Sequence, residues 1–213
     1  LFTMKFSLTL LSLLFSISIS FCQRLNTPPL SPNSKLSQQI GLTEISIEYA
    51  RPSAKGRSVI GDLVPFGKIW RTGANASTKI TLTEAGKIGG NDIDAGTYAL
   101  YTIPEKDTWT IIIHSNTKMR SLAGDVYKQA DDVFRFMAPS QKITPAVETF
   151  TLQFADLTSN SVNLQLTWEN TLINIPIEVE VDQKITQQMT EFLKAPDAIP
   201  HRTYFEAAQY YLN

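Results

Sequence analysis

Apolar and polar residues alternate with a period of two along the central part of the chain. Ile45, Ile47 and Tyr49 alternate with Ser46 and Glu48, as expected for a strand with one buried face and one face in water. The alternation recurs further along the chain, with apolar members at Ile80, Leu82, Phe150, Leu152, Phe154, Val162, Leu164, Leu166, Trp168, Ile173, Ile175, Ile177 and Val179.

Several shorter features complete this pattern. Residues 109–114 form an isoleucine-rich run, residues 133–137 a short apolar one, and the pair Gly89-Gly90 is typical of a hairpin turn. About eight or nine strands at short spacing, with no helices between them, predict an all-β fold. We therefore expect an antiparallel β-sandwich over residues 37–181, a length that supports a single core.

The period changes after residue 181. Ile185, Met189, Phe192 and Leu193 fall at i, i+4, i+7 and i+8, which predicts one apolar stripe on a helix. A second helix is expected from about residue 202. The pair resembles the opening of a helical-hairpin repeat of the tetratricopeptide kind, so residues 182–213 are interpreted as a short α-helical extension, a truncated repeat.

The first residues have the layout of a targeting signal. One lysine precedes an apolar run that is short for a membrane span and is interrupted by serines. We expect a signal peptide at residues 4–22, a Pro/Ser/Asn-rich linker at 23–36, and a periplasmic or extracellular protein without a transmembrane span after cleavage. Acylation of Cys22 is the alternative, and it is disfavoured because the bulky Phe21 precedes that cysteine.

Composition limits the classes of partner. The 213 residues are 43% hydrophobic and carry a formal net charge of −1, so nothing attracts the whole chain to nucleic acid. Cys22 is the single cysteine, and its loss with the signal peptide would leave neither a disulfide nor a thiolate zinc site.

Residues 51–75 have neither a helix period nor a strand period. They carry five cations against one acid, Asp62. A functional interpretation presents side chains to an anion or a sugar ring; the candidate ligand-binding residues are Arg51, Lys55, Arg57, Trp70, Arg71 and Asn75. A structural interpretation is slightly favoured. In it, this segment covers one end of the sandwich, and its polar side chains donate hydrogen bonds to backbone carbonyls of the loop.

Motifs for catalysis or metal binding are incomplete. Gly61 and Gly67 are one residue too far apart for a phosphate-binding loop. Asp92 and Asp94 resemble the start of a calcium-binding loop, but the residues that would complete such a loop are absent. Two histidines, His114 and His201, do not make a zinc site by their spacing. No cofactor, metal or catalytic residue is predicted. A hydrolytic carboxylate pair stays open, with Asp125, Asp131, Asp132, Glu148 and Glu169 available.

Several segments resemble a known family. They are Arg51-Pro-Ser-x-Lys-Gly-Arg57, Gly61-x-Leu-Val-Pro-Phe-Gly-Lys-x-Trp-Arg-Thr-Gly-Ala-Asn75, Ala95-Gly-Thr-Tyr-Ala-Leu100, Val147-Glu-Thr-Phe150 and Leu166-x-Trp-Glu-x-Thr171. They resemble the bacterial exported family catalogued as domain of unknown function 2911. The resemblance implies a secreted or periplasmic β-rich domain of Bacteroidetes-type bacteria and no activity. Many members place Asn where His114 stands, which weakens a catalytic role for that histidine.

These observations favour a non-enzymatic module of the bacterial envelope that binds a ligand or a protein through residues 51–75. Its partner would be a small molecule, a glycan or an envelope protein. A carbohydrate-active hydrolase and a purely structural domain are the alternatives.

Overall fold

The computed structural model describes residues 25–119, 127–194 and 200–212. Nine strands lie in the order β1-β2-β3-β6-β7-β8-β9-β4-β5, each antiparallel to its neighbour. They are β1 (Asn33–Ile40), β2 (Thr43–Ala50), β3 (Thr78–Leu82), β4 (Gly86–Ile88), β5 (Asn91–Ile93), β6 (Gly96–Ile103), β7 (Thr108–His114), β8 (Asp132–Ala155) and β9 (Ser161–Val179). The predicted all-β antiparallel fold is confirmed. The predicted signal peptide, Cys22 and Asp125 lie outside the described residues.

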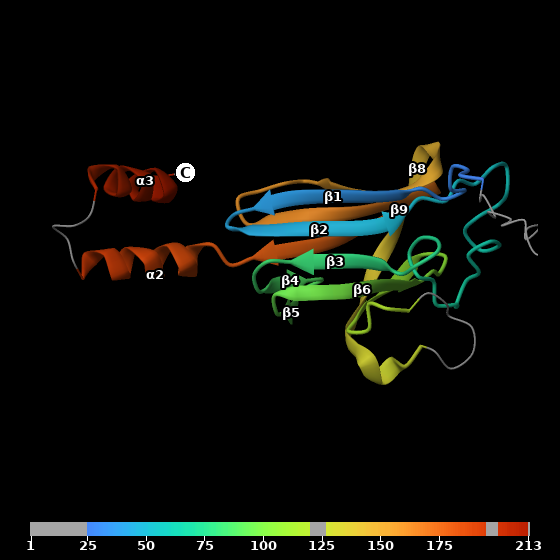
Figure 1. The fold of residues 1–213 in the computed structure, drawn as a ribbon, viewed down its shortest axis with the longest axis horizontal. Helices are drawn as coiled ribbons and strands as arrows, with labels where there is room; N and C mark the ends of the chain where they lie inside the picture. Colours follow the sequence, from blue (N-terminus) through green and yellow to red (C-terminus); the bar gives the residue numbers. More distant parts are fainter. Residues whose placement is uncertain (1–24, 120–126, 195–199, 213) are drawn as a thin grey trace, which may run out of the picture.

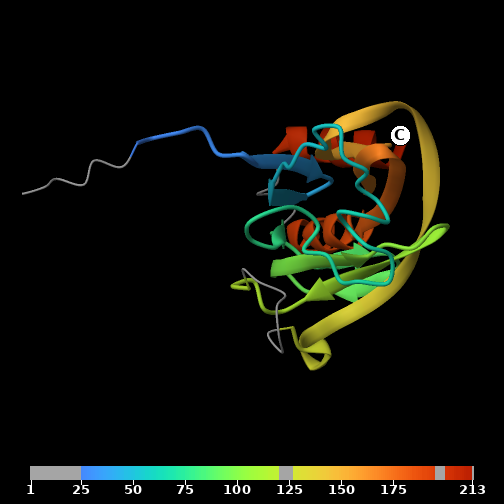
Figure 2. The same ribbon diagram turned by 90° about the vertical axis from the view of Figure 1, so that its right-hand side faces the viewer.

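One long strand, β8, joins the layers of the sandwich. The first part of β8 pairs with β7 as far as Pro139, and its second part pairs with β9 from Ser140 onward. Strand β9 stays in the second layer, where it pairs first with β8 and then, near Ile177, with β4. Figure 2 shows β8 curving along one side of the molecule from one layer to the other.

The main core lies between these layers. Every strand contributes enclosed inward residues, in keeping with the period of two. They include Ile45, Ile47, Ile80, Leu100, Trp109, Ile111, Phe150, Leu164, Leu166 and Trp168. A second, smaller cluster lies on the opposite face of β6 and β7, and it contains Ala99, Tyr101, Ile112 and Met119.

A 3₁₀ turn, η2 (Gln129–Asp131), precedes β8, and two helices follow the sheet, α2 (Asp182–Leu193) and α3 (His201–Leu212). The two predicted helices are therefore present, while a tetratricopeptide-like repeat stays a prediction. Both helices extend beyond one end of the strands, and residues 51–77 cover the opposite end (Figure 1). In the part of the chain that the structure describes, none of the helices has the length and apolar character needed to cross a membrane.

Candidate functional site

Trp70 belongs to an aromatic cluster that closes one end of the core. Its ring stacks on Trp168, with centroids 5.7 Å apart, and meets Trp109 and Phe150 edge-on at 6.3 and 5.0 Å. The indole Nε1 donates to the carbonyl of Gly73 at 3.0 Å. Such contacts stabilise the loop through both packing and a satisfied indole N–H.

Arg51, which is half-buried, and Arg57, which is exposed, both use their guanidinium groups to form hydrogen bonds within the protein. Arg51 donates from Nε to the Phe150 carbonyl at 3.2 Å and from Nη2 to Thr151 Oγ1 at 2.8 Å. Arg57 donates from Nε and Nη2 to the carbonyls of Ala54 and Ser53, both at 2.9 Å. These bonds satisfy loop and strand-edge carbonyls, as the structural interpretation expects.

Two glutamates from the strands fasten the same segment. Glu169 accepts from the backbone N–H groups of Val59 and Ile60, each at 3.0 Å. Glu148 accepts from the backbone N–H of Lys55 at 2.7 Å. The Lys55 side chain is itself exposed.

Both glutamates also line a hollow of about 340 Å³ together with Arg57 and Asn170. The sequence named these carboxylates as catalytic candidates, and the structure brings them together. Both oxygens of Glu169 are already engaged by the backbone. A carboxylate bonded in this way holds the loop at residues 59 and 60 against strand β9.

Arg71 and Asn75 are held together elsewhere in the loop. Arg71 donates from Nη1 to the Asn75 carbonyl at 2.8 Å, and Asn75 Nδ2 donates to the Ser31 carbonyl at 3.4 Å. Asn75 has a φ of 64°, a left-handed conformation that asparagine adopts more readily than most residues. Of the six predicted site residues, the structure thus brings Arg71 and Asn75 into direct contact.

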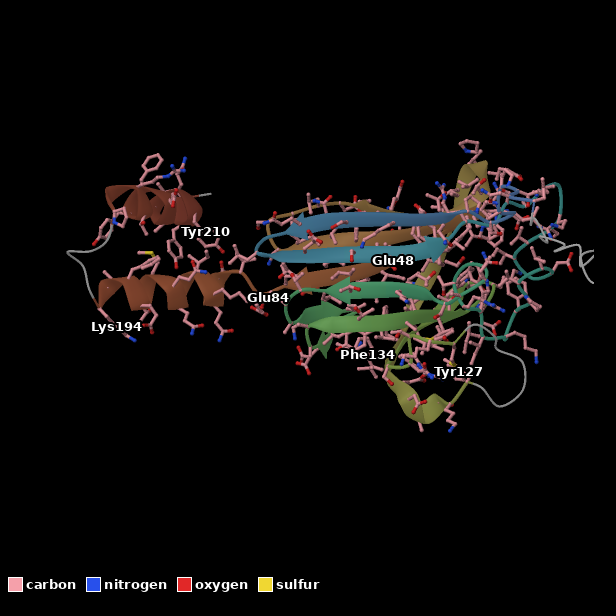
Figure 3. The ribbon with its side chains drawn as sticks, viewed as in Figure 1. Glu48, Glu84, Tyr127, Phe134, Lys194 and Tyr210 are labelled. Carbon is pink, nitrogen blue, oxygen red and sulfur yellow. The ribbon has the colours of Figure 1, made fainter. Side chains whose placement is uncertain are left out.

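Asn75 also lines a cleft of about 550 Å³, which we call the strand-end cleft. It opens where β1 begins, β2 ends and β3 begins, and its walls are Asn33, Ser34, Lys35, Glu48, Tyr49, Ala50, Ala74, Asn75, Ala76, Ser77 and Lys79. Glu48 lies on β2 near this end of the sandwich (Figure 3). Sequence reasoning found Asn75 but missed the strand residues, because the register that aligns them is set by long-range pairing.

The charges of the cleft follow the sheet register. Glu48 on β2 is the pairing partner of Lys35 on β1 and of Lys79 on β3. Lys35 Nζ lies 3.1 Å from Glu48 Oε1. Two lysines and one glutamate give the lining a charge of +1, in a chain whose net charge is −1.

Ser77, in the wall of the cleft, and Tyr101 on β6 have buried hydroxyl groups. Ser77 is 4% exposed and Tyr101 is 0% exposed, and neither hydroxyl has a hydrogen-bond partner among the described residues. Burial raises the pKa of Tyr101, and the nearby Ser77 and Arg71 oppose that rise.

His114 lies on the same side of the sheet and is fully buried. Its Nδ1 accepts from the backbone N–H of Asn116 at 3.0 Å, so Nε2 carries the proton and donates to the Lys128 carbonyl at 3.2 Å. The ring packs against Tyr101 and Tyr127, with centroids 5.5 and 5.2 Å away. Both ring nitrogens of His114 are therefore engaged by the backbone.

Next to His114 lies an ion pair that sequence reasoning did not anticipate. Asp132 accepts from the Tyr127 hydroxyl and from Arg135 Nε, and Arg135 Nη2 donates to the Tyr127 hydroxyl at 2.7 Å. Burial, together with the Asp132 carboxylate, raises the pKa of Tyr127 well above its ordinary value. The group fixes the start of β8 against the segment before it.

Metal ligation receives no support from the described residues, because no group of three or more His, Cys, Asp or Glu side chains converges there. Two polar hollows therefore lie beside predicted site residues in the described part of the chain, the strand-end cleft at Asn75 and the smaller hollow at Arg57.

Comparison with known proteins gives a family but no activity. No curated protein matches the chain, and no solved structure matches it. The family model described as "Protein of unknown function (DUF2911)" matches residues 31–177, which include all nine strands except the last two residues of β9. The chain belongs to this DUF2911 family of proteins of unknown function.

Proposed function

We propose that this protein is a non-enzymatic, exported binding module of the bacterial envelope, and that a small polar ligand occupies the strand-end cleft. The observation that carries the proposal is the cleft itself, about 550 Å³ and bordered by charged and amide side chains. That volume falls within the range of about 300–1,000 Å³ that is typical of small-molecule sites.

Preorganisation of the cleft supports a binding role. Arg71 and the Ser31 carbonyl hold Asn75 from two sides. A rigid wall lowers the entropy that is lost when a ligand binds. An Asn75 held in place at the border of the cleft is consistent with a preformed binding wall.

Catalysis is less well supported in the described part of the chain. The cleft contains one carboxylate, Glu48, which is paired with Lys35. His114 has no free nitrogen with which to act as a base. A hydrolase that uses Glu148 and Glu169 is the second candidate, because the two carboxylates line one hollow.

Export rests on the sequence. An apolar run after one lysine has the layout of a signal peptide. The helical extension would then supply a surface for an envelope protein, since Phe205 and Leu212 of α3 are 63% and 85% exposed.

A ligand screen by thermal unfolding tests the proposal. Polar metabolites and envelope glycan fragments are added to the wild-type protein, to Ala76→Trp, which fills the cleft, and to Ala130→Trp, an exposed control position outside it. We expect at least one compound to raise the Tm of the wild type and of Ala130→Trp by mass action, and to leave Ala76→Trp unchanged. Equal shifts in all three proteins, or no shift with any compound, would contradict the proposal.

A further inference from the structure

We infer that the strand-end cleft selects a hydroxylated carboxylate, a sugar acid of the hexuronate type. This inference rests on the proposed function and specifies its ligand. It follows from the charge of the cleft, from the polar groups beside that charge, and from the absence of an aromatic platform among its lining residues.

Lys79 supplies the anchor for an anion. Lys35 is paired with Glu48 at 3.1 Å, whereas Lys79 lies within ion-pair distance of no carboxylate among the residues that the structure describes. An ammonium group without an ion pair, at the border of a cleft with a charge of +1, attracts a carboxylate.

The wall beside Lys79 suits hydroxyl groups. Glu48 uses Oε1 to contact Lys35, which leaves Oε2 to accept hydrogen bonds from a ligand. Asn33 and Ser34, at the start of β1, and Asn75, in the loop, add amide and hydroxyl groups to the same cleft. A ligand with one acidic group and several hydroxyls matches this combination of donors and acceptors.

The lining disfavours two other classes of ligand. Tyr49 is the single aromatic residue of the cleft, and it is 5% exposed with its hydroxyl bonded to the backbone of Leu152. No ring face is therefore offered to an aromatic ligand or to the apolar face of a neutral sugar. A phosphate dianion has twice the charge that the lining balances and would face the Glu48 carboxylate.

Isothermal titration calorimetry of the full chain tests the inference with galacturonate, glucuronate, the matching neutral hexoses, acetate and inorganic phosphate. We expect a hexuronate to bind about tenfold or more tightly than its neutral hexose, a difference of ~1.4 kcal/mol. Lys79→Gln should abolish this preference, whereas Lys106→Gln, at an exposed turn outside the cleft, should retain it.

A second variant tests the role of the hydroxyl groups. Glu48→Gln keeps both lysines and raises the charge of the lining to +2. We expect it to bind acetate and phosphate more tightly and to lose its preference for hexuronate over acetate, because the acceptor for hydroxyl groups is weakened.

Three results would overturn the inference, namely equal affinity for hexuronate and hexose, tighter binding of phosphate by the wild type, or an unchanged preference in Lys79→Gln. If a neutral compound binds the wild type but not Ala76→Trp, the inference fails while the proposed function stands. If Ala76→Trp alters no binding at all, both fail.

Discussion

Tyr127 connects the pKa of one side chain to the stability of the domain at alkaline pH. Its pKa is raised in the folded protein, mainly by burial and also by Asp132, whereas in the unfolded chain it returns to about 10. Above that pH the unfolded state binds fewer protons than the folded state, so the free energy of unfolding decreases as the pH rises. The contribution of Tyr127 is complete below pH ~10 and is lost as the pH approaches the folded-state pKa.

The first prediction concerns this tyrosine. Tyr127→Phe is expected to be less stable than the wild type near pH 8, because the Asp132 and Arg135 bonds to the hydroxyl are lost. The difference between the two proteins should narrow above pH ~10. Urea unfolding from pH 8 to 11 measures this, with Tyr204→Phe, at an exposed position, as the control. A difference that stays constant with pH would show that Tyr127 does not govern alkaline stability.

Single residues were only partly predictable from the sequence. The segment around Trp70 was recognised as unusual because it has no period, but its partner Trp168 is almost a hundred positions away in the chain. The same holds for Arg51, which bonds to residues 150 and 151. Short-range patterns indicate that such side chains need partners, and only the folded register decides which partners they have.

Among the elements, the hairpin of β4 and β5 depends on its two glycines. Gly89 and Gly90 have φ values of 59° and 77°, the left-handed conformations required by a tight two-residue turn. A Cβ at Gly89 would lie 2.5 Å from the Phe136 ring, whereas a Cβ at Gly90 would meet nothing within 4 Å. The two positions therefore share the backbone requirement and differ in steric room.

This pair provides a matched prediction. Gly90→Ala is expected to destabilise the protein by about 1 kcal/mol, the cost of a left-handed alanine. Gly89→Ala should cost ~2–4 kcal/mol, because the Phe136 ring must also move. Urea unfolding of both variants measures the difference in free energy. Equal losses of stability in the two variants would mean that the Phe136 ring does not restrict the turn.

Strand β8 is much longer than the strand that the sequence pattern predicted. The pattern predicted a short strand at residues 133–137, but β8 runs from Asp132 to Ala155. Proline lacks the N–H group that a central strand needs. Pro139 is tolerated because β8 leaves β7 at that residue and joins β9 at the next one. The point at which the predicted strand ended is therefore the point at which one continuous strand, β8, changes its pairing partner from β7 to β9.

At the scale of the whole molecule, the sandwich and the helices differ in how much core they contribute. Nearly all enclosed apolar residues precede Val181, and Ile185 and Tyr210 pack only partly against them. Lys184 and Glu84, 3.0 Å apart, add an exposed ion pair, which contributes little. Tyr210 projects from α3 toward α2 (Figure 3) and donates to Asp182.

Removal of residues 182–213 is accordingly expected to leave a folded β-sandwich. The loss of stability should be about 1–3 kcal/mol, since few apolar groups become exposed. Circular dichroism and urea unfolding of the shortened protein measure it against the full chain. A shortened chain without a cooperative transition would show that the helices are part of the folding unit.

The sequence predicted the fold more completely than the site. The period of two identified both the antiparallel strands and their buried residues, because that period is a direct result of strand geometry. The strand-end cleft depends on Lys35, Glu48 and Lys79 lying side by side. Their alignment across three strands has no signature in local spacing, so one lining residue, Asn75, was named in advance.

The passage of β8 from one layer to the other has a mechanical consequence. Because this single strand pairs with β7 in one layer and with β9 in the other, the two layers cannot separate along that side without bending β8 and breaking its ladders. Opening and closing of the frame around a guest molecule is therefore suppressed. Discrimination among guests must then come from the chemistry of the lining and not from the frame closing around them.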